Sequence, residues 1–228
     1  MPLAEGTAVA DTRVDAGAYD AWYDTPRGAW IGDIEFWLLR RQLQPEAGER
    51  LLDVGCGTGY FTRRFADQCR LCVVGIDRDL RWLAFARDRG GRAERYCLGH
   101  AEALPFADRS FDYTVSVAAL CFVADQRSAL REILRVTRKR FAVGLLNRRS
   151  LLYPQKGRDG GKGAYRGAHW HTAEEIRALL DRLPVANLVL RTAVVLPNGG
   201  ALARVIEHIL PTRLLVGSFI VAAGNVLE

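Results

Sequence analysis

Several features typical of exported or membrane proteins are scarce in this chain of 228 residues. Residues 1–15 lack the basic start and the apolar core of a signal peptide, so we expect a protein that is not exported. The longest apolar stretch near the end, residues 214–223, is too short to span a bilayer and contains a glycine and a serine. We therefore expect a soluble, cytoplasmic protein with no membrane partner.

Cysteine is present without a clear metal or disulfide pattern. The chain has five cysteines, an odd number, and Cys69 and Cys72 have the C-x-x-C spacing of redox and zinc sites. No second pair and no histidine pair accompanies them, and Cys72 is expected to start a buried strand. We therefore predict free thiols in a reducing compartment, and no metal site.

The formal net charge is +6, and arginine supplies most of the positive charge. Basic clusters at 138–140 and 148–149 would suit an RNA substrate. Residues 138–140, however, are expected at a helix C-terminus, where cations complement the helix dipole. A solvated surface is the favoured interpretation, and a nucleic-acid partner is not expected.

The most informative segment is LLDVGCGTG at residues 51–59. Short apolar residues lead into Asp53, and glycines follow at positions 55, 57 and 59. This pattern predicts a strand, a tight turn and a helix start, because glycine allows positive φ angles and close approach of the backbone to a ligand. The helix that begins after Gly59 would direct its free amides towards the anionic end of that ligand.

The glycine spacing differs from that of dinucleotide-binding proteins. Their G-x-G-x-x-G pattern places a pyrophosphate on the helix, whereas here the third glycine comes one residue early and Tyr60 occupies its usual position. Asp53, just before the loop, would repel a diphosphate. The ligand should carry a cation near Asp53 and at most one weak anion, a description that S-adenosylmethionine meets.

A second acid, Asp77, ends the apolar run 71–76, which is typical of a buried parallel strand. A carboxylate at the tip of that strand can accept hydrogen bonds from both hydroxyls of a ribose. The alternative is that Asp77 caps the helix that follows, a common role for aspartate. Its pairing with the glycine loop favours ribose binding.

Apolar strands alternate with amphipathic helices, which predicts a doubly wound α/β sheet. We expect strands near 50–54, 71–76, 93–98, 111–117, 140–146, 187–195 and 214–222, and helices near 27–43, 59–67, 79–89, 126–137, 173–182 and 200–209.

Residues 47–146 resemble a class I S-adenosylmethionine-dependent methyltransferase, most closely the small-molecule branch called type 11. The resemblance is carried by DVGCGTG at 53–59, GID at 75–77, and GHAEALPF at 99–106 followed by SFD at 110–112. It implies a Rossmann-like sheet of seven mostly parallel strands in the order 3-2-1-4-5-7-6, with the seventh strand antiparallel.

The third segment packs on the adenine in that family, which usually has Asp where this chain has His100. A neutral imidazole can also accept a hydrogen bond from the adenine amino group, whereas a protonated one cannot. The alternative is a solvent-facing His100, with the backbone of Ala101 and Glu102 recognising the base. Both interpretations stay open.

The resemblance also implies an N-terminal helical lid, residues 1–45, followed by a methyltransferase domain, residues 46–228. A helix should begin near residue 27 with Trp37 in its buried stripe. Tyr19 and Tyr23 precede this helix and could close over the ligand, because aromatic faces attract a sulfonium and exclude water.

Residues 147–171 form a glycine-rich segment that we interpret as a mobile substrate loop. It ends in His169 and His171, either of which could remove a proton from a methyl acceptor. The alternative is that both histidines pack around the start of the next helix, where Thr172 and Glu175 form a capping box.

The sequence therefore predicts an S-adenosylmethionine-dependent methyltransferase for a small organic acceptor. The run Ser116-Val-Ala-Ala119 stands where amide-nitrogen methyltransferases have an Asn-Pro-Pro-Tyr signature, which disfavours DNA adenine as substrate. A nucleoside-binding protein without turnover and an RNA methyltransferase are the alternatives. The predicted catalytic candidates are His169 and His171, and the predicted cofactor-binding residues are Tyr19, Tyr23, Asp53, Gly55, Cys56, Gly57, Gly59, Asp77, Arg78, His100, Ala101, Glu102 and Val117.

Overall fold

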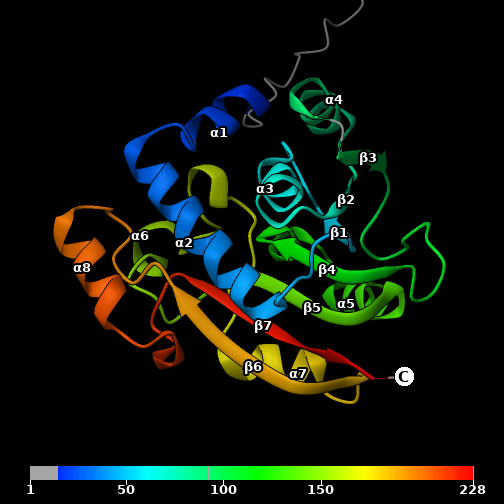
Figure 1. Cartoon of the computed structure of the whole chain (residues 1–228). Helices are drawn as coiled ribbons and strands as arrows, with labels where there is room; N and C mark the ends of the chain where they lie inside the picture. The colour runs from blue at the N-terminus through cyan, green and yellow to red at the C-terminus, as the bar shows by residue number, and fades with distance from the viewer. Residues whose placement is uncertain (1–14, 92, 228) are drawn as a thin grey trace, which may run out of the picture.

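The computed structural model describes residues 15–91 and 93–227 of the chain. Its strands in this part are β1 (Arg50–Val54), β2 (Cys72–Asp77), β3 (Glu94–Leu98), β4 (Phe111–Val117), β5 (Thr137–Leu146), β6 (Val185–Ala193) and β7 (Phe219–Val226). They form one sheet in the order β3-β2-β1-β4-β5-β7-β6 (Figure 1). The strands from β3 to β5 are parallel, and β7 is antiparallel to both of its neighbours. The predicted strand order is confirmed.

Helices cover both faces of the sheet, as Figure 1 shows. Side chains alternate between the faces along each strand, so Leu51 packs in the cluster that contains α2 and α3, and its neighbour Leu52 packs with α5 and α7. None of the described helices is long and apolar enough to cross a membrane. The helices are α1 (Ala16–Trp22), α2 (Pro26–Leu43), α3 (Tyr60–Cys69), α4 (Leu80–Arg89), α5 (Gln126–Val136), α6 (Tyr153–Lys156), α7 (Ala173–Leu180) and α8 (Ala201–Ile209), with short 3-10 turns η1 (Ala119–Phe122), η2 (Gly163–Tyr165) and η3 (Thr212–Leu214).

Two capped helices, α1 and α2, precede the sheet. The Asp15 carboxylate accepts a hydrogen bond from the Ala18 amide, and the Thr25 hydroxyl accepts one from the Gly28 amide, so each helix begins at a side-chain cap. Pro26 stands in the first turn of α2, where its fixed φ angle suits a helix. Residues 1–14 of the predicted N-terminal lid lie outside the described residues, and its boundary at residue 45 stays a prediction.

A buried ion-pair cluster fastens α1 to the domain. Asp20 is 3% exposed and pairs with Arg63 of α3 at 3.1 Å and with Arg89 of α4 at 2.7 Å. These pairs join residues far apart in the chain. The short helix α1 was not among the expected helices, because the contacts that hold it are not local.

Two expectations, one about packing and one about a strand boundary, are wrong. Trp37 lies on the outside of α2, 52% exposed, with the Arg40 guanidinium 4.7 Å from the centroid of its ring. Cys72 does start the largely buried strand β2, although its own side chain is exposed. The last strand begins at Phe219 instead of residue 214, because the apolar run first forms η3 and then passes Gly217, where an added Cβ would overlap the backbone of Ala193.

The glycine-rich segment 147–171 is fastened at both ends. The His171 amide donates to the Leu146 carbonyl and the Arg148 amide donates to the His171 carbonyl, both at 2.8 Å. Between these points the segment contains α6 and η2. Its buried tryptophan, Trp170, packs against Tyr153 and Tyr165 with ring centroids 5.5 Å apart in each pair.

Candidate active site

The glycine loop connects the end of β1 to α3 at the carboxyl edge of the parallel strands. Gly55, Gly57 and Gly59 all have positive φ angles, of 74°, 53° and 77°. A Cβ added to Gly55 would also overlap the Cβ of Ala119, which begins η1 after the end of β4. Glycine at position 55 is therefore required both by its backbone conformation and by the close approach of the neighbouring turn.

The loop is bonded to the tip of β2. The amides of Gly55 and Cys56 donate to the Ile76 carbonyl at 2.7 and 3.0 Å, and the Gly57 amide donates to a carboxylate oxygen of Asp77 at 2.9 Å. The turn from β1 and the acid at the end of β2 consequently form one hydrogen-bonded unit.

Asp77 does not cap the next helix. That role belongs to Asp79, whose side chain accepts from the Arg81 amide, while Asp77 accepts from the Asp79 amide at 2.9 Å through its other oxygen. Each carboxylate oxygen of Asp77 thus accepts one backbone hydrogen bond. Since an ionised carboxylate offers about four lone-pair sites, both oxygens keep acceptor capacity for a ligand hydroxyl.

Asp53 lies beneath the loop and is 1% exposed. The Thr62 hydroxyl donates to its carboxylate at 2.6 Å. Burial raises the pKa of Asp53 to about 7, against the lowering effect of the Thr62 bond, and the charge of Asp77 raises it further. The two predicted acids therefore lie within electrostatic reach of each other, and a cation between them would stabilise both charges.

The N-terminus of α3 has no side-chain cap. Gly59 stands at the N-cap position, and the first amides of the helix follow it. Arg63 of this helix donates to the Thr58 carbonyl of the loop at 2.7 Å and also pairs with Asp20. The uncapped end is suited to the carboxylate of an amino-acid ligand.

The segment predicted to meet an adenine lies beside Asp77. The Gly99 amide donates to the Asp77 backbone carbonyl at 3.0 Å, and His100 forms a bridge with Ala103. His100 is exposed, while Ala101 and Glu102 are half-buried. Arg78, the residue after Asp77, is exposed as well.

Val117 ends β4 on the other side of β1 and is half-buried. Ala118 follows with a φ angle of 56°, a conformation that costs an alanine about 1–2 kcal/mol. This turn directs Ala119 onto Gly55. Val117 is therefore at the same edge of the sheet as the loop.

Aromatic side chains from α1 and from Tyr23, which directly follows it, flank the loop. The rings of Tyr19 and Trp82 are 5.0 Å apart, and Trp82 lies 3.3 Å from the position of a Cβ on Gly57. Tyr23 stacks on Tyr60, the first residue of α3, at a centroid distance of 3.7 Å. The structure thus brings both predicted lid tyrosines next to the glycine loop.

The two candidate histidines differ. His169 is exposed, and its amide donates to the Cys121 carbonyl of η1. His171 is fully buried, with Nε2 at 2.8 Å from Oε1 of Gln126, whose amide group donates to the Leu120 carbonyl. His171 consequently donates through Nε2 and leaves Nδ1 as a bare acceptor, while burial lowers its pKa to about 4.

Glu35 of α2 is an acid that the sequence analysis missed. It is half-buried, and burial alone raises its pKa to about 8. Ile31 and Gly32, about one turn earlier on the same side of the helix, are buried. The sequence feature that could have identified Glu35 is a glutamate in a helix whose positions Ile31, Phe36 and Leu39 are buried.

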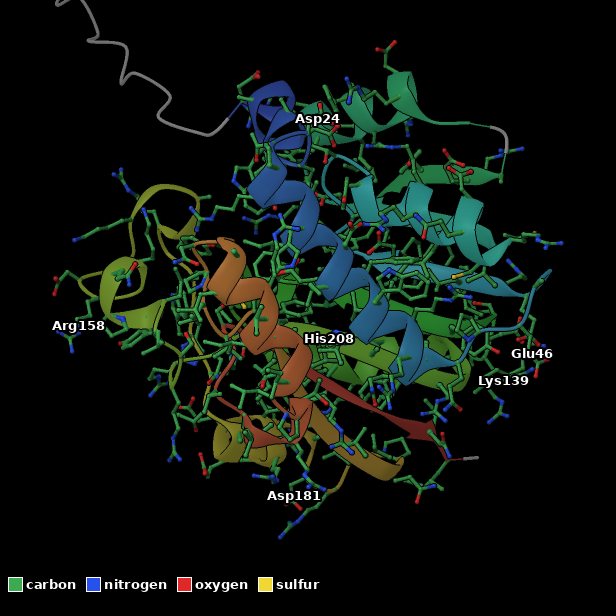
Figure 2. The ribbon with its side chains drawn as sticks, turned by 60° about the vertical axis from the view of Figure 1, so that its left-hand side comes forward. Asp24, Glu46, Lys139, Arg158, Asp181 and His208 are labelled. Atoms are coloured by element: carbon green, nitrogen blue, oxygen red, sulfur yellow. The ribbon has the colours of Figure 1, made fainter. Side chains whose placement is uncertain are left out.

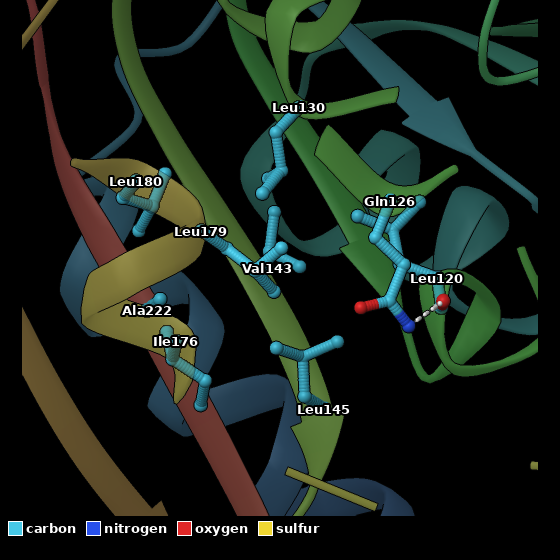
Figure 3. A pocket seen from close by; sticks show the side chains of 9 residues that line it. All are labelled: Leu120, Gln126, Leu130, Val143, Leu145, Ile176, Leu179, Leu180 and Ala222. Atoms are coloured by element: carbon cyan, nitrogen blue, oxygen red, sulfur yellow. Dashed lines mark hydrogen bonds between the residues drawn. The ribbon is translucent and has the colours of Figure 1, made fainter. Parts of the chain in front are cut away.

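A separate void lies on the other side of the sheet (Figure 3). It measures about 10 Å³, and apart from Gln126 its lining is apolar. This volume is that of about one water molecule. The void has neither the size nor the polar groups to hold a nucleoside. It is lined by residues from η1, α5, β5, α7 and β7: Leu120, Gln126, Leu130, Val143, Leu145, Ile176, Leu179, Leu180 and Ala222.

Comparison with known proteins agrees with this geometry. A family model described as a methyltransferase domain matches residues 52–141. An uncharacterized protein of Mycobacterium tuberculosis is 37% identical over 171 residues, which cover 73% of this chain and 56% of that protein. A malonyl-[acyl-carrier protein] O-methyltransferase of Serratia marcescens is 40% identical over 91 residues, covering 40% of this chain and 35% of that protein. The chain thus spans about half the length, or less, of these curated relatives.

Solved structures extend the likeness to the whole fold. A crystal structure of a Thermotoga maritima S-adenosylmethionine-dependent methyltransferase, described as a possible histamine N-methyltransferase, has a TM-score of 0.69 at 26% identity and covers 92% of this chain and 95% of that one. Phosphoethanolamine N-methyltransferase 2 of Haemonchus contortus, in complex with S-adenosylmethionine, has a TM-score of 0.69 at 17% identity, covering 96% and 59%. Residues 52–141 thus match a methyltransferase domain, and the fold of the chain is similar to that of S-adenosylmethionine-dependent methyltransferases.

Proposed function

We propose that this protein transfers the methyl group of S-adenosylmethionine to a small organic acceptor. The observation that carries the proposal is the hydrogen-bonded unit of the glycine loop and Asp77, with the buried acid Asp53 beneath it. This arrangement offers hydroxyl acceptors, free helix amides and negative charge at one edge of the sheet. S-adenosylmethionine supplies an activated methyl group on a sulfonium, so the protein must mainly bind, align and exclude water.

Each part of the site has a proposed role. Asp77 holds the ribose hydroxyls, and Asp53 orients the loop and attracts the amino group. Gly55, Cys56, Gly57 and Gly59 admit the methionyl part, which Val117 approaches from β4. The adenine is bordered by Arg78, His100, Ala101 and Glu102. Tyr19 and Tyr23 close over the donor, in keeping with their packing beside the loop.

The glycine-rich segment 147–171 is proposed to border the acceptor. His171 has a bare Nδ1 acceptor atom, and His169 lies 4.5 Å away, measured between ring centroids. The exposed His169 can take a proton from an acceptor hydroxyl or amine, whereas His171 is 0% exposed, burial lowers its pKa to about 4, and it packs just before the start of α7. The relatives are named for acceptors as different as malonyl-acyl-carrier protein and histamine, so their names alone do not select an acceptor for this chain.

An RNA acceptor is less well supported. In the basic cluster at 138–140, Arg138 lies 3.6 Å from Asp112, Lys139 pairs with Glu49, and Arg140 donates to Gln44. Figure 2 shows Lys139 at the end of the molecule where Glu46 also lies, far from Arg158 of the glycine-rich segment. We further propose a cytoplasmic location, in keeping with five cysteines that are all free.

Calorimetric titration with S-adenosylhomocysteine tests the proposal. Asp77→Asn should lower the affinity about 10-fold or more, because a hydrogen bond to a charged group contributes about 1.5–3 kcal/mol. Asp112→Asn is the matched control, since Asp112 also accepts a backbone amide, that of Arg50, but at the start of β4. Folded protein that does not bind, or equal affinities for wild type and Asp77→Asn, would contradict the proposal. Binding without any methylated product would instead support the nucleoside-binding alternative.

A further inference from the structure

Helix α8 presents an apolar stripe to solvent. Leu202, Val205 and Ile209 are 67%, 54% and 70% exposed. They stand at positions i, i+3 and i+7 of the helix, so they share one face. The buried residue of α8, Ala203, lies on a different side. A surface helix normally turns its apolar stripe to the core, whereas α8 turns this one outward.

The contacts of α8 hold it in this orientation. The carboxylate of Glu207 accepts hydrogen bonds from the amides of Val194 and Val195, both at 2.8 Å. On another side of the helix, the guanidinium carbon of Arg204 lies 5.5 Å from the centroid of the Trp30 ring in α2. The helix is therefore fastened through its polar residues, and the apolar stripe is left outside the core.

The charge that remains exposed near the stripe is positive. Glu207 is the only acid of residues 194–218, and each of its carboxylate oxygens accepts one of the two amides. The basic residues of the same stretch, Arg204 and Arg213, are exposed, and so is His208 (Figure 2). The surface of α8 thus combines exposed aliphatic side chains with positive charge.

The glycine-rich segment 147–171 adds positive charge next to α8. The side chain of Asn147 donates to the carbonyls of Leu215 and Gly217 at 2.9 and 2.8 Å, which ties the start of the segment to the turn after α8. Figures 1 and 2 both show the segment beside this helix. Asp159 is the only acid of the segment. Apart from Arg148 and Arg149, which pair with acids of α7, its exposed lysines and arginines are Lys156, Arg158, Lys162 and Arg166.

An anionic bilayer complements this surface better than another protein does. A helix with apolar side chains on one face and basic residues around them is typical of helices that lie in the membrane interface. Anionic lipid headgroups attract lysine and arginine side chains near the membrane surface. The cores of protein interfaces are enriched in aromatic residues and methionine, whereas the stripe of α8 is entirely aliphatic. Helix α8 also lies at the periphery of the molecule (Figure 1).

We propose that α8 docks this protein on the surface of an anionic lipid bilayer. Leu202, Val205 and Ile209 enter the boundary between headgroups and acyl chains, and the exposed cations of residues 204–213 and 156–166 lie at the lipid phosphates. The contact is peripheral, since α8 has nine residues and lies on the membrane instead of crossing it. We expected no membrane partner from the sequence, which does not reveal whether an apolar helix face is buried in the fold. Neither donor nor acceptor takes part in this contact, so it is independent of the proposed function.

Sedimentation of this chain with lipid vesicles tests the proposal. Vesicles of phosphatidylcholine alone are compared with vesicles in which about a third of the lipid is phosphatidylglycerol. We expect the wild type to partition at least about 10-fold more strongly onto the anionic vesicles, and about 0.5 M NaCl to weaken this binding. The double variant with Leu202→Ser and Ile209→Ser should bind the anionic vesicles at least about 10-fold more weakly, because it removes apolar area that enters the bilayer.

The matched control is the double variant with Leu80→Ser and Leu227→Ser. These leucines are 59% and 52% exposed, and they lie in other parts of the molecule, at the start of α4 and after β7 (Figure 1). This variant should bind vesicles as the wild type does. Hydrogen exchange locates the contact in the wild type itself. With anionic vesicles present, the amides of residues 201–209 should exchange more slowly, while those of β1 should not change.

Several results would overturn the membrane contact. They are the absence of binding to anionic vesicles by the folded wild type, equal binding to neutral and anionic vesicles, and a serine variant of α8 that binds as the wild type does. Unchanged hydrogen exchange of residues 201–209 on binding would overturn it as well. A wild type that ignores vesicles but forms a dimer, which the serine variant of α8 does not form, would assign the stripe to a second copy of this chain instead. Titration with S-adenosylhomocysteine in the absence of vesicles tests the proposed function separately.

Discussion

The ion pairs of Asp20 predict that one substitution will release α1 from the domain. The Asp20 side chain is 4% exposed, and its partners Arg63 and Arg89 are 18% and 51% exposed. Loss of one partner costs about 3–5 kcal/mol in a buried pair and about 0–1 kcal/mol in an exposed pair, so Asp20→Asn should weaken the docking of α1 by about 2–3 kcal/mol. A change of 2 kcal/mol is a factor of roughly 30 in the docking equilibrium.

Hydrogen exchange of the α1 amides measures this release. In Asp20→Asn, residues 16–22 should exchange about 30- to 150-fold faster, while the amides of β4 keep their protection because the sheet is untouched. Affinity for S-adenosylhomocysteine should fall as well, since Tyr19 lies in α1 and Tyr23 directly follows it. Asp24→Asn is the control, because Asp24 is exposed just after α1 (Figure 2). Unchanged exchange in α1 of the Asp20→Asn protein would refute the reasoning.

Two further predictions concern the loop and Glu35. In urea unfolding, Gly55→Ala should lower the free energy of unfolding more than Gly48→Ala does. Both positions have positive φ angles, of 74° and 86°, but only a Cβ at position 55 meets a neighbour, Ala119. Equal losses in the two variants would show that the contact with Ala119 carries no cost. The folded-state pKa of Glu35 is about 8, above its ordinary 4.5, so the folded protein binds more protons between these values and its stability falls as pH rises through them. The free energy of unfolding of Glu35→Gln, relative to that of the wild type, should therefore increase from about pH 5 to about pH 9. If the difference between the two proteins does not change with pH, the carboxyl group is not buried as described.

Features that depend on local sequence were predictable. The glycine loop and Asp77 are specified by residue types within a short stretch, since positive φ angles and a strand-end carboxylate need no distant partner. The strand order came with the family resemblance and is confirmed. Even the ends of β1 and β4 agree with the expected ranges 50–54 and 111–117.

Features that depend on distant contacts were not predictable. The helix α1 is seven residues long and is held by arginines 43 and 69 positions later in the chain. Glu35 stands out only in the folded structure, where burial raises its pKa to about 8. An apolar run likewise does not reveal where its strand begins, as the start of β7 at Phe219 illustrates.

A crystal structure of the protein with S-adenosylhomocysteine tests the central claim most directly. The account predicts the ribose hydroxyls within hydrogen-bonding distance of the Asp77 carboxylate, the amino-acid end over the glycine loop above Asp53, and the adenine beside residues 99–102. A nucleoside bound elsewhere, with the Asp77 carboxylate still bonded only to the amides of Gly57 and Asp79, would contradict it.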